Sequence, residues 1–317
     1  MHRTVGFARV ARLLDMDRSD IVDLASRAQG MYHTMVIPVG QKKRIIDVPR
    51  PELKTVQRAL HDRVFSTVPL SESVYSVAGA GVIANAKRHL AQPHMAILDI
   101  EACFPTTTVS MVQCALLAAG FDEQATKYLT PLVTVRGRLP QGPPSSPSVM
   151  NIVLRDVDFE LDILAAHAGV VYTRYMDDLC FSGGNDLRAL ASHAKIILRR
   201  HGFATNAIKN RVWGPADPHT LTKVIVTTEL NAQPEYVQAI VTELSRLAVG
   251  TNLLTPAQIR GQIAWICALN RRAGTRLLKR WNAVPGRKPS GRRKPSGRQI
   301  SLRSLRSLRP RDLGVKA

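Results

Sequence analysis

The residues of this chain best suited to catalysis are two adjacent carboxylates, Asp177 and Asp178. β-Branched and aromatic residues flank them throughout 170–182, which predicts a β-hairpin that holds both acids at its turn. Side-by-side carboxylates repel each other, so a fold that keeps them together usually supplies a cation, and hard oxygen ligands favour Mg²⁺ over zinc. An isolated Asp-Asp pair is more often a plain exposed turn, so the chemistry needs support from other segments.

A third carboxylate, Asp99, closes an apolar strand predicted over 95–100. At the end of a strand its side chain would emerge beside the hairpin acids. Three such acids are a common arrangement for phosphoryl transfer with two metal ions, and the backbone carbonyl of Ile100 offers one more oxygen ligand. The sequence therefore predicts two Mg²⁺ ions held by Asp99, Asp177, Asp178 and Ile100.

The elements around these acids alternate between strands and helices. A hairpin over 32–48 with a basic tip is followed by a helix at 51–66, and the loop 139–147 leads into another helix. After the acidic hairpin, a helical face over 187–198 ends at Gly202. The order strand, helix, hairpin, helix, strand suits a ferredoxin-like split βαβ domain.

The helix after the proline-rich loop is predicted to run from Pro147 to about Ala166, with Ser146 as its N-cap. We assign its four acids to solvent rather than to metal, namely Asp156, Asp158, Glu160 and Asp162. The segment 128–136 is predicted to be a connection. Farther along, 213–229 is predicted to form a hairpin, and 234–248 and 256–270 are predicted helices.

The composition indicates a polyanionic partner. The 317 residues, 45% of them apolar, can bury one large core or several packed subdomains, and 44 basic against 24 acidic residues leave a net charge of +20. We expect a cytoplasmic protein without a membrane partner, because no apolar run reaches spanning length and no signal-peptide core is present. The four cysteines lack metal-ligand spacing, and we interpret them as buried apolar residues.

The last 33 residues, 285–317, differ from the rest. They carry eleven Lys or Arg and one Asp, which gives this segment a net charge of +10, and Ser-Leu-Arg occurs in it three times. Such a sequence cannot bury a core, so we predict a disordered tail that adds salt-sensitive affinity for a polyanion.

Four segments in this order resemble the palm of a reverse transcriptase, and the bacterial retron type is the closest match, over roughly residues 35–280. They are the strand ending at Asp99, the loop 139–147, the Asp177-Asp178 hairpin and the segment 202–209. An Asn-Ala-x-x-His pattern at 85–89 and the segment 260–265 also resemble retron enzymes. Where those enzymes usually have Val-Thr-Gly, this chain has Leu221-Thr222-Lys223 and keeps only the threonine.

The resemblance implies an α+β fold of the right-hand polymerase type, with fingers, a ferredoxin-like palm and a helical thumb. The expected parts are an N-terminal helical segment (1–30), fingers (31–94), a palm (95–230, with an insert around 120–147), a thumb (231–284) and the basic tail (285–317).

The resemblance also implies roles for individual residues. Phe104, five residues after Asp99, stands where the family carries an aromatic gate against a ribose 2′-hydroxyl, which favours deoxynucleotides. The residues expected to bind nucleotide are Lys43, Arg44, Phe104, Gln141, Tyr175, Met176 and Lys209. Those expected to bind RNA are Asn85, His89, Thr222 and Arg260.

The implied activity is RNA-directed DNA synthesis from dNTPs, on a cognate structured noncoding RNA that is both template and primer. In the retron family the product is single-stranded DNA branched from the RNA, called msDNA, and it commonly serves antiphage defence with an effector protein as a further partner. Two alternatives stay open. One is another bacterial reverse transcriptase, of the abortive-infection, diversity-generating or group II intron class, and the other is a noncatalytic protein of this fold that binds RNA or restrains an effector.

Overall fold

The computed structural model describes residues 4–39 and 42–284, so the tip of the predicted first hairpin and the predicted basic tail lie outside the described residues. The described chain divides into two compact units. The first contains residues 4–85 and 93–215, and the second contains 86–92 and 216–284. The finer division into fingers, palm and thumb at the expected boundaries stays a prediction.

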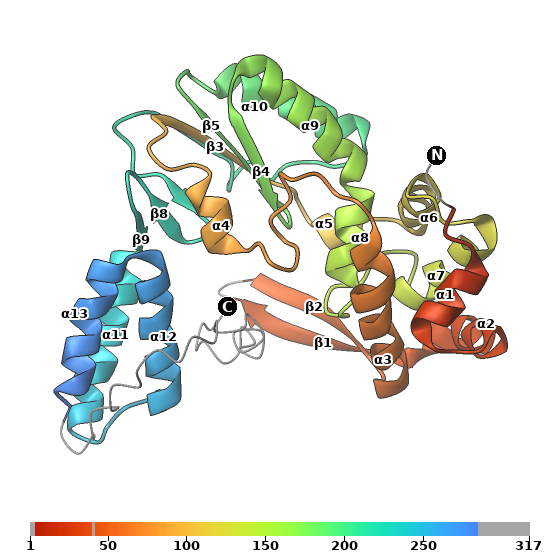
Figure 1. Ribbon diagram of the computed structural model, residues 1–317, viewed down its shortest axis with the longest axis horizontal. Coiled ribbons are helices and arrows are strands. Elements are labelled where there is room, and N and C mark those ends of the chain that lie inside the picture. Colours follow the sequence, from red (N-terminus) through yellow and green to blue (C-terminus); the bar gives the residue numbers. More distant parts are fainter. Residues whose placement is uncertain (1–3, 40–41, 285–317) are drawn as a thin grey trace, which may run out of the picture. The chain divides into compact units, whose positions relative to one another are not determined.

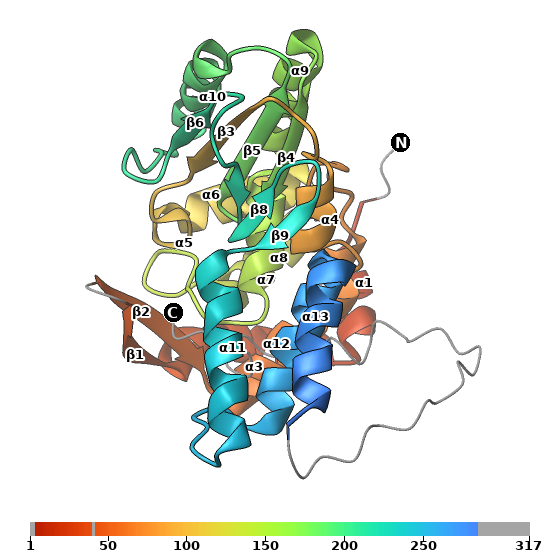
Figure 2. The same ribbon diagram turned by 90° about the vertical axis from the view of Figure 1, so that its left-hand side faces the viewer.

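The first unit is built around a four-stranded antiparallel sheet with the order β4-β5-β3-β6. Its strands are β3 (His94–Asp99), β4 (Val171–Tyr175), β5 (Asp178–Gly183) and β6 (Arg211–Trp213), and they lie side by side in Figure 2. This order is that of a ferredoxin-like domain, as predicted.

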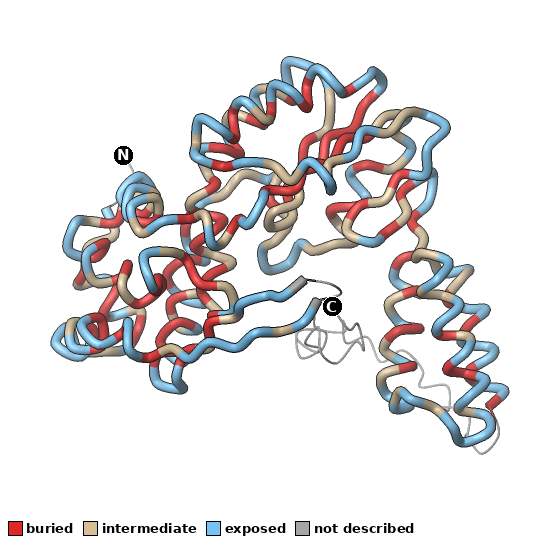
Figure 3. Tube along the Cα trace, turned by 180° about the vertical axis from the view of Figure 1, so that it is seen from behind, coloured by how far each residue is buried: buried red, intermediate tan, exposed pale blue. Residues whose placement is uncertain are grey.

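Two helices cover this sheet, α9 (Arg155–Ala168) against β4 and α10 (Arg188–Arg200) against β3 (Figure 1). Strands β3, β4 and β5 are buried for most of their length, whereas β6 at the edge is largely exposed. Figure 3 colours the buried residues red. Between β4 and β5 the rings of Tyr172 and Phe181 stack with their centroids 4.9 Å apart. Apolar packing of this kind fixes the strand register, because a slip by one residue would turn every buried side chain outward.

The other elements of the first unit either precede β3 in the chain or lie between β3 and β4. A long hairpin pairs β1 (Tyr32–Val39) with β2 (Lys42–Pro49), in agreement with the predicted hairpin. The helices are α1 (Phe7–Leu14), α2 (Arg18–Arg27), α3 (Pro51–Ala59), α5 (Cys103–Thr106), α6 (Val109–Ala118), α7 (Glu123–Val133) and α8 (Ser146–Val153). Helix α4 (Val82–Lys87) runs across the boundary between the two units.

Three sequence interpretations were wrong here. The predicted connection 128–136 is largely helix α7, which Asp122 caps by accepting the Ala125 N–H at 2.6 Å and which tolerates an internal Pro131. The single helix predicted up to Ala166 is two helices, α8 and α9, separated at Leu154. Cys114 is exposed rather than buried.

The acids of α9 are a further correction, because three of the four are at least partly buried against protein partners. Asp158 is buried against Arg174, Glu160 pairs with Arg200 and His201, and Asp162 accepts hydrogen bonds from the hydroxyls of Ser71 and Ser73. Only Asp156 is exposed as predicted.

The second unit contains a small sheet and three helices. Strands β7 (Thr220–Leu221), β8 (Val224–Val226) and β9 (Leu230–Ala232) pair in that order. The predicted hairpin over 213–229 is therefore divided, because its first residue belongs to β6 in the other unit. Helices α11 (Pro234–Ala248) and α12 (Pro256–Leu269) match their predictions, and α13 (Arg271–Asn282), which the sequence did not single out, packs with them around one apolar core.

Two local features hold the second unit's helices. Thr255 and Gln258 form a capping box at the start of α12, and Asn270 caps α13 by accepting the Ala273 N–H at 3.1 Å. Gly274 lets α13 approach α12, because a Cβ there would lie 2.5 Å from the Cα of Cys267. No helix among the residues described here is both long and apolar enough to cross a membrane.

Candidate active site

The turn of the β4–β5 hairpin carries the predicted acid pair. Tyr175 and Asp178 are register partners, so Met176 and Asp177 form a two-residue turn, and Met176 takes a positive φ of 59°. A non-glycine residue rarely adopts this conformation, which costs about 1–3 kcal/mol unless the surroundings impose it. The turn is thus a strained element fixed by its neighbours.

The register of β3 against β5 places Asp99 directly opposite Asp178. The pairing continues past the strand end, where the Ile100 N–H donates to the Asp177 carbonyl at 2.9 Å. Facing side chains on antiparallel strands have Cβ atoms about 5 Å apart, so the two carboxylates are neighbours. The three acids that the sequence separates by nearly 80 positions therefore meet at one end of the sheet.

Burial and mutual repulsion disfavour negative charge on the hairpin acids. Burial, and then the charges of Asp177 and Asp99, raise the pKa of Asp178 from 3.8 to about 7. Burial raises the pKa of Asp177 as well, with a further contribution from Asp99, while Lys209 and Arg44 act in the opposite direction. A cation placed among these groups would relieve this electrostatic strain.

A short loop after α10 holds Asp99 from the other side. The Asn206 N–H donates to the Asp99 carbonyl at 2.8 Å, and the Asn210 side-chain oxygen accepts the Asp99 N–H at 3.1 Å. The Lys209 ammonium pairs with Asp99 Oδ1 at 2.5 Å, and its predicted role in nucleotide binding stays a prediction. Asn206 and Asn210 were not identified from the sequence as site residues. Two asparagines within five residues are nevertheless typical of a turn in which side chains hydrogen-bond the backbone.

A pocket of about 520 Å³ opens beside these acids, a size suited to a nucleotide. Most of the predicted nucleotide and metal residues line it, namely Lys43, Arg44, Asp99, Ile100, Phe104, Gln141, Asp177 and Lys209. Tyr175, Met176 and Asp178 are not among its lining residues. The lining also includes Asp47, Arg138 and Asn206, which the sequence did not point to.

One wall of this pocket is fixed by the contact between β2 and the loop before α8. The Asp47 N–H donates to the Gln141 carbonyl at 2.8 Å, and the buried Asp47 carboxylate pairs with Arg136. Gly142 has a φ of +125°, and a Cβ there would lie 2.7 Å from Ile46 Cγ2. Glycine is required at this position for both reasons. Lys43 and Arg44 therefore project from a strand whose base is anchored next to the pocket.

The donor set suits an oxygen-ligated divalent ion completed by substrate. Among the described residues, no three His, Cys, Asp or Glu side chains form a ready-made metal cluster. Mg²⁺ is commonly bound by one or two carboxylates together with substrate phosphates rather than by a complete protein cage. Asp99 and Asp177 at the pocket and the raised pKa values of the hairpin acids fit that open type of site.

The residues predicted to bind RNA have contrasting environments. Asn85 and His89 are fully buried, and burial, with a contribution from Arg88, lowers the pKa of His89 to about 3, so its ring is neutral. Thr222 lies in the two-residue turn between β7 and β8 with a positive φ of 46°. Arg260 is exposed on α12. Their role in RNA binding stays a prediction.

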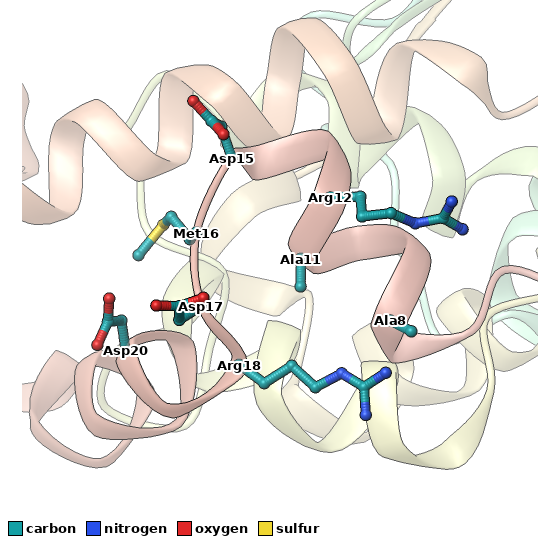
Figure 4. Close-up of a pocket in the computed structure, with 8 residues that line it drawn as sticks. All are labelled: Ala8, Ala11, Arg12, Asp15, Met16, Asp17, Arg18 and Asp20. Carbon is teal, nitrogen blue, oxygen red and sulfur yellow. The ribbon is translucent and has the colours of Figure 1, made fainter.

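Another pocket, of about 780 Å³, lies between α1 and α2 (Figure 4). It carries Asp15, Asp17 and Asp20, but all three acids are exposed, and in Figure 4 Arg12 and Arg18 extend away from them. This pocket lacks the buried, strained carboxylates that distinguish the site at β3 and β5.

A ferredoxin-like sheet with acids on its central strand and hairpin turn, beside a cationic pocket of nucleotide size, defines the palm of a nucleic-acid polymerase. The model of the reverse transcriptase (RNA-dependent DNA polymerase) family matches residues 37–222. This chain belongs to the reverse transcriptase family.

Proteins similar to this chain in sequence are also reverse transcriptases. The chain is 29% identical to the retron Mx65 reverse transcriptase of Myxococcus xanthus, over 82% of this chain and 65% of that protein. It is 24% identical to the retron Ec86 reverse transcriptase of Escherichia coli, over 75% of this chain and 76% of that protein. Among solved structures, apo telomerase from Candida tropicalis matches 81% of this chain and 58% of its own chain with a TM-score of 0.50 and 11% identity, which supports the fold alone. The predicted resemblance to retron-type reverse transcriptases is confirmed.

Proposed function

We propose that this protein is an RNA-directed DNA polymerase that copies a cognate structured noncoding RNA into DNA. The single observation that carries the proposal is the pairing of Asp99 with Asp178 across β3 and β5, next to a pocket lined by Arg44 and Lys209. Carboxylates for metal and cations for phosphates then lie around one nucleotide-sized space.

Within this site each residue has a defined task. Two Mg²⁺ ions bound by Asp99, Asp177 and Asp178 would lower the pKa of the primer hydroxyl and offset charge on the leaving pyrophosphate. Arg44 and Lys43 neutralise the phosphate oxygens of the incoming dNTP. Lys209 lies close enough to the acids to move a proton to the departing pyrophosphate.

Phe104 gives the site its preference for deoxynucleotides. Its side chain lines the pocket just after Ile100 and Cys103, where the ring would collide with a ribose 2′-hydroxyl. Gln141, Tyr175 and Met176 complete the surroundings of the base and primer end in this proposal.

The proposed template is a structured RNA encoded beside the gene, and the product is msDNA used in antiphage defence with an effector protein. The net charge of +20 and the similarity to retron reverse transcriptases support a nucleic-acid partner of this kind. Asn85, His89, Thr222 and Arg260 are the residues we propose for RNA recognition, the two buried ones by shaping the surface rather than by touching RNA.

The test is expression of the full chain with its neighbouring noncoding RNA, followed by analysis of the nucleic acid that copurifies. We expect small single-stranded DNA joined to RNA that separates only after a 2′,5′ debranching enzyme is added. In Asp177→Asn this product should disappear while the RNA still copurifies, and Asp156→Asn, which alters an exposed acid, should behave as wild type.

The outcome also separates the alternatives. DNA synthesis without branched product would favour another class of bacterial reverse transcriptase. Full biological effect and retained RNA binding in Asp177→Asn, with no DNA in either protein, would overturn the proposal in favour of a noncatalytic RNA-binding protein.

A further inference from the structure

Arg174, two residues before the catalytic turn, is a charged side chain that the fold buries completely. Its guanidinium meets the equally buried Asp158 of α9 through two parallel hydrogen bonds, Nε to Oδ1 at 2.7 Å and Nη2 to Oδ2 at 2.6 Å. The Tyr172 hydroxyl donates to the same Oδ1 at 2.8 Å. The carboxylate therefore fixes the plane of the guanidinium, as a bidentate pair does.

The third guanidinium nitrogen reaches the turn itself. Arg174 Nη1 donates to the Met176 carbonyl at 2.9 Å and to the Asn151 side-chain oxygen of α8 at 2.9 Å. Met176 is the residue with the strained positive φ, and its carbonyl belongs to the peptide that leads into Asp177. One side chain thus connects two helices behind the sheet with the backbone that presents the acids.

The backbone of Arg174 is held as firmly as its side chain. Its N–H donates to the Ser73 carbonyl at 2.7 Å, and its carbonyl accepts the Tyr75 N–H at 2.8 Å. The guanidinium is therefore anchored to β4, to α8 and to α9 before it meets the turn. Burying an ion pair is a poor way to gain stability, because apolar residues of similar volume often serve as well or better. Only a planar group with several donors can satisfy Asp158, Asn151 and Met176 together.

We propose that Arg174 is a positioning residue that, with Asp158 as its anchor, imposes the strained turn conformation and so fixes where Asp177 and Asp178 bind metal. The inference rests on the proposed function for its consequence in catalysis, but the geometry it describes exists without substrate or metal. A residue that only stabilised the core would affect the whole first unit equally, whereas a positioning residue affects the turn first.

The experiment compares Asp158→Asn, and the double variant Arg174→Gln with Asp158→Asn, with wild type in the full chain. The double variant removes both charges at once, so no unpaired charge is left buried. Arg200→Gln is the matched control, because Arg200 also pairs with an acid of α9, Glu160, but makes no contact with the turn. Backbone hydrogen exchange is measured in metal-free protein, and the Mg²⁺ concentration for half-maximal DNA synthesis is measured separately.

In the double variant we expect exchange in the turn segment 175–178 to accelerate about tenfold or more relative to wild type, with exchange in β3 and α10 changed by less than about twofold. The Mg²⁺ requirement should rise about fivefold or more, and Asp158→Asn should change both in the same direction. Arg200→Gln should leave both at wild-type values.

Unchanged exchange at 175–178 in both variants, or acceleration spread evenly over the first unit, would overturn the inference. If the double variant does not fold, Tyr172→Phe, which removes one hydrogen bond to Asp158 and leaves the ion pair intact, decides the question by the same exchange comparison. If wild-type protein makes no DNA, the proposed function is wrong. The hydrogen-exchange comparison would still test whether Arg174 positions the turn.

Discussion

At Asp178, burial and two neighbouring carboxylates act in the same direction on one proton. They raise its pKa in the folded protein to about 7, whereas the unfolded chain has the ordinary value of 3.8. The folded state therefore keeps a proton between these two pH values that the unfolded state releases. Stability from this group is fully present below about pH 4 and is lost as the pH rises through 7.

We therefore expect Asp178→Asn to become progressively more stable than wild type as the pH rises. A shift of three pKa units corresponds to at most about 4 kcal/mol, and about 2 kcal/mol is a realistic gain between pH 4.5 and 8 for a partly solvated group. The measurement is urea unfolding of both proteins in EDTA. If the unfolding free energies of the two proteins change in parallel with pH, the raised pKa of Asp178 is contradicted. Mg²⁺ at pH 8 should reduce the difference in unfolding free energy, because it stabilises wild type.

A second prediction at the residue scale concerns Phe104 and the preference for dNTPs over rNTPs. Phe104→Ala should lower the preference for dNTPs over rNTPs by about tenfold to a hundredfold, because the ring no longer excludes the 2′-hydroxyl. The check is the ratio of kcat/KM for a dNTP and its rNTP, with Phe159→Ala, an exposed phenylalanine on α9, as the control. An unchanged ratio in Phe104→Ala would make the ring a plain packing residue.

At the scale of elements, the contact between β2 and the loop before α8 determines where Lys43 and Arg44 stand. Gly142→Ala should destabilise the protein by about 2–4 kcal/mol and raise the KM for dNTP, because both the positive φ and the clash with Ile46 oppose a Cβ. Gly137→Ala is the control, since its φ of +77° adds strain but a Cβ there meets nothing within 4 Å.

Comparing Gly142→Ala with Gly137→Ala separates the effect of the contact between β2 and the loop before α8 from the effect of backbone strain alone. If Gly137→Ala and Gly142→Ala lose the same stability and keep the same KM for dNTP, the loop does not support the nucleotide wall of the pocket. Thermal unfolding and steady-state kinetics on one template suffice to decide.

The elements that could be predicted from the sequence are those whose signals are local. The apolar run that ends at Asp99 and the aromatic strands around Asp177 predicted β3, β4 and β5, and helical patterns predicted α11 and α12. Family resemblance supplied the pocket residues. Local signals could not predict a residue's environment where that environment depends on a distant partner. Asp158, for example, is buried because it pairs with Arg174 on another element.

The break between α8 and α9 was not predicted, for a related reason. No glycine or proline marks Leu154, so the periodic apolar pattern continues across it while packing of the two helices redirects the chain. In the same way, the segment 128–136 was predicted as a connection, whereas the Asp122 cap and the buried residues of α7 stabilise a helix there despite Pro131.

For the whole molecule, charge is the dominant property. The segment 285–317 contributes +10 of the net +20. Truncation after Val284 should therefore weaken RNA binding most at low salt and reduce the slope of log Kd against log salt by several units, since each neutralised phosphate contributes about 0.7–0.9 to it. Filter binding of the cognate RNA at several salt concentrations measures this slope.

The control for the truncation is the full chain with the eleven Lys and Arg of 285–317 replaced by Gln. It should reproduce the truncated slope if charge alone is responsible. An unchanged slope in both variants would assign RNA affinity to the described part of the chain, where α13 presents five exposed cations.

The ion pair between Lys209 and Asp99 has one more consequence, for the order in which the centre is filled. In the proposed function, a metal ion that binds Asp99 Oδ1 would compete with the Lys209 ammonium already paired there, so loading at this oxygen would exchange one positive charge for another. The displaced side chain would then be free to turn into the pocket, which Lys209 also lines. On this proposal, metal binding would make the lysine available for proton transfer.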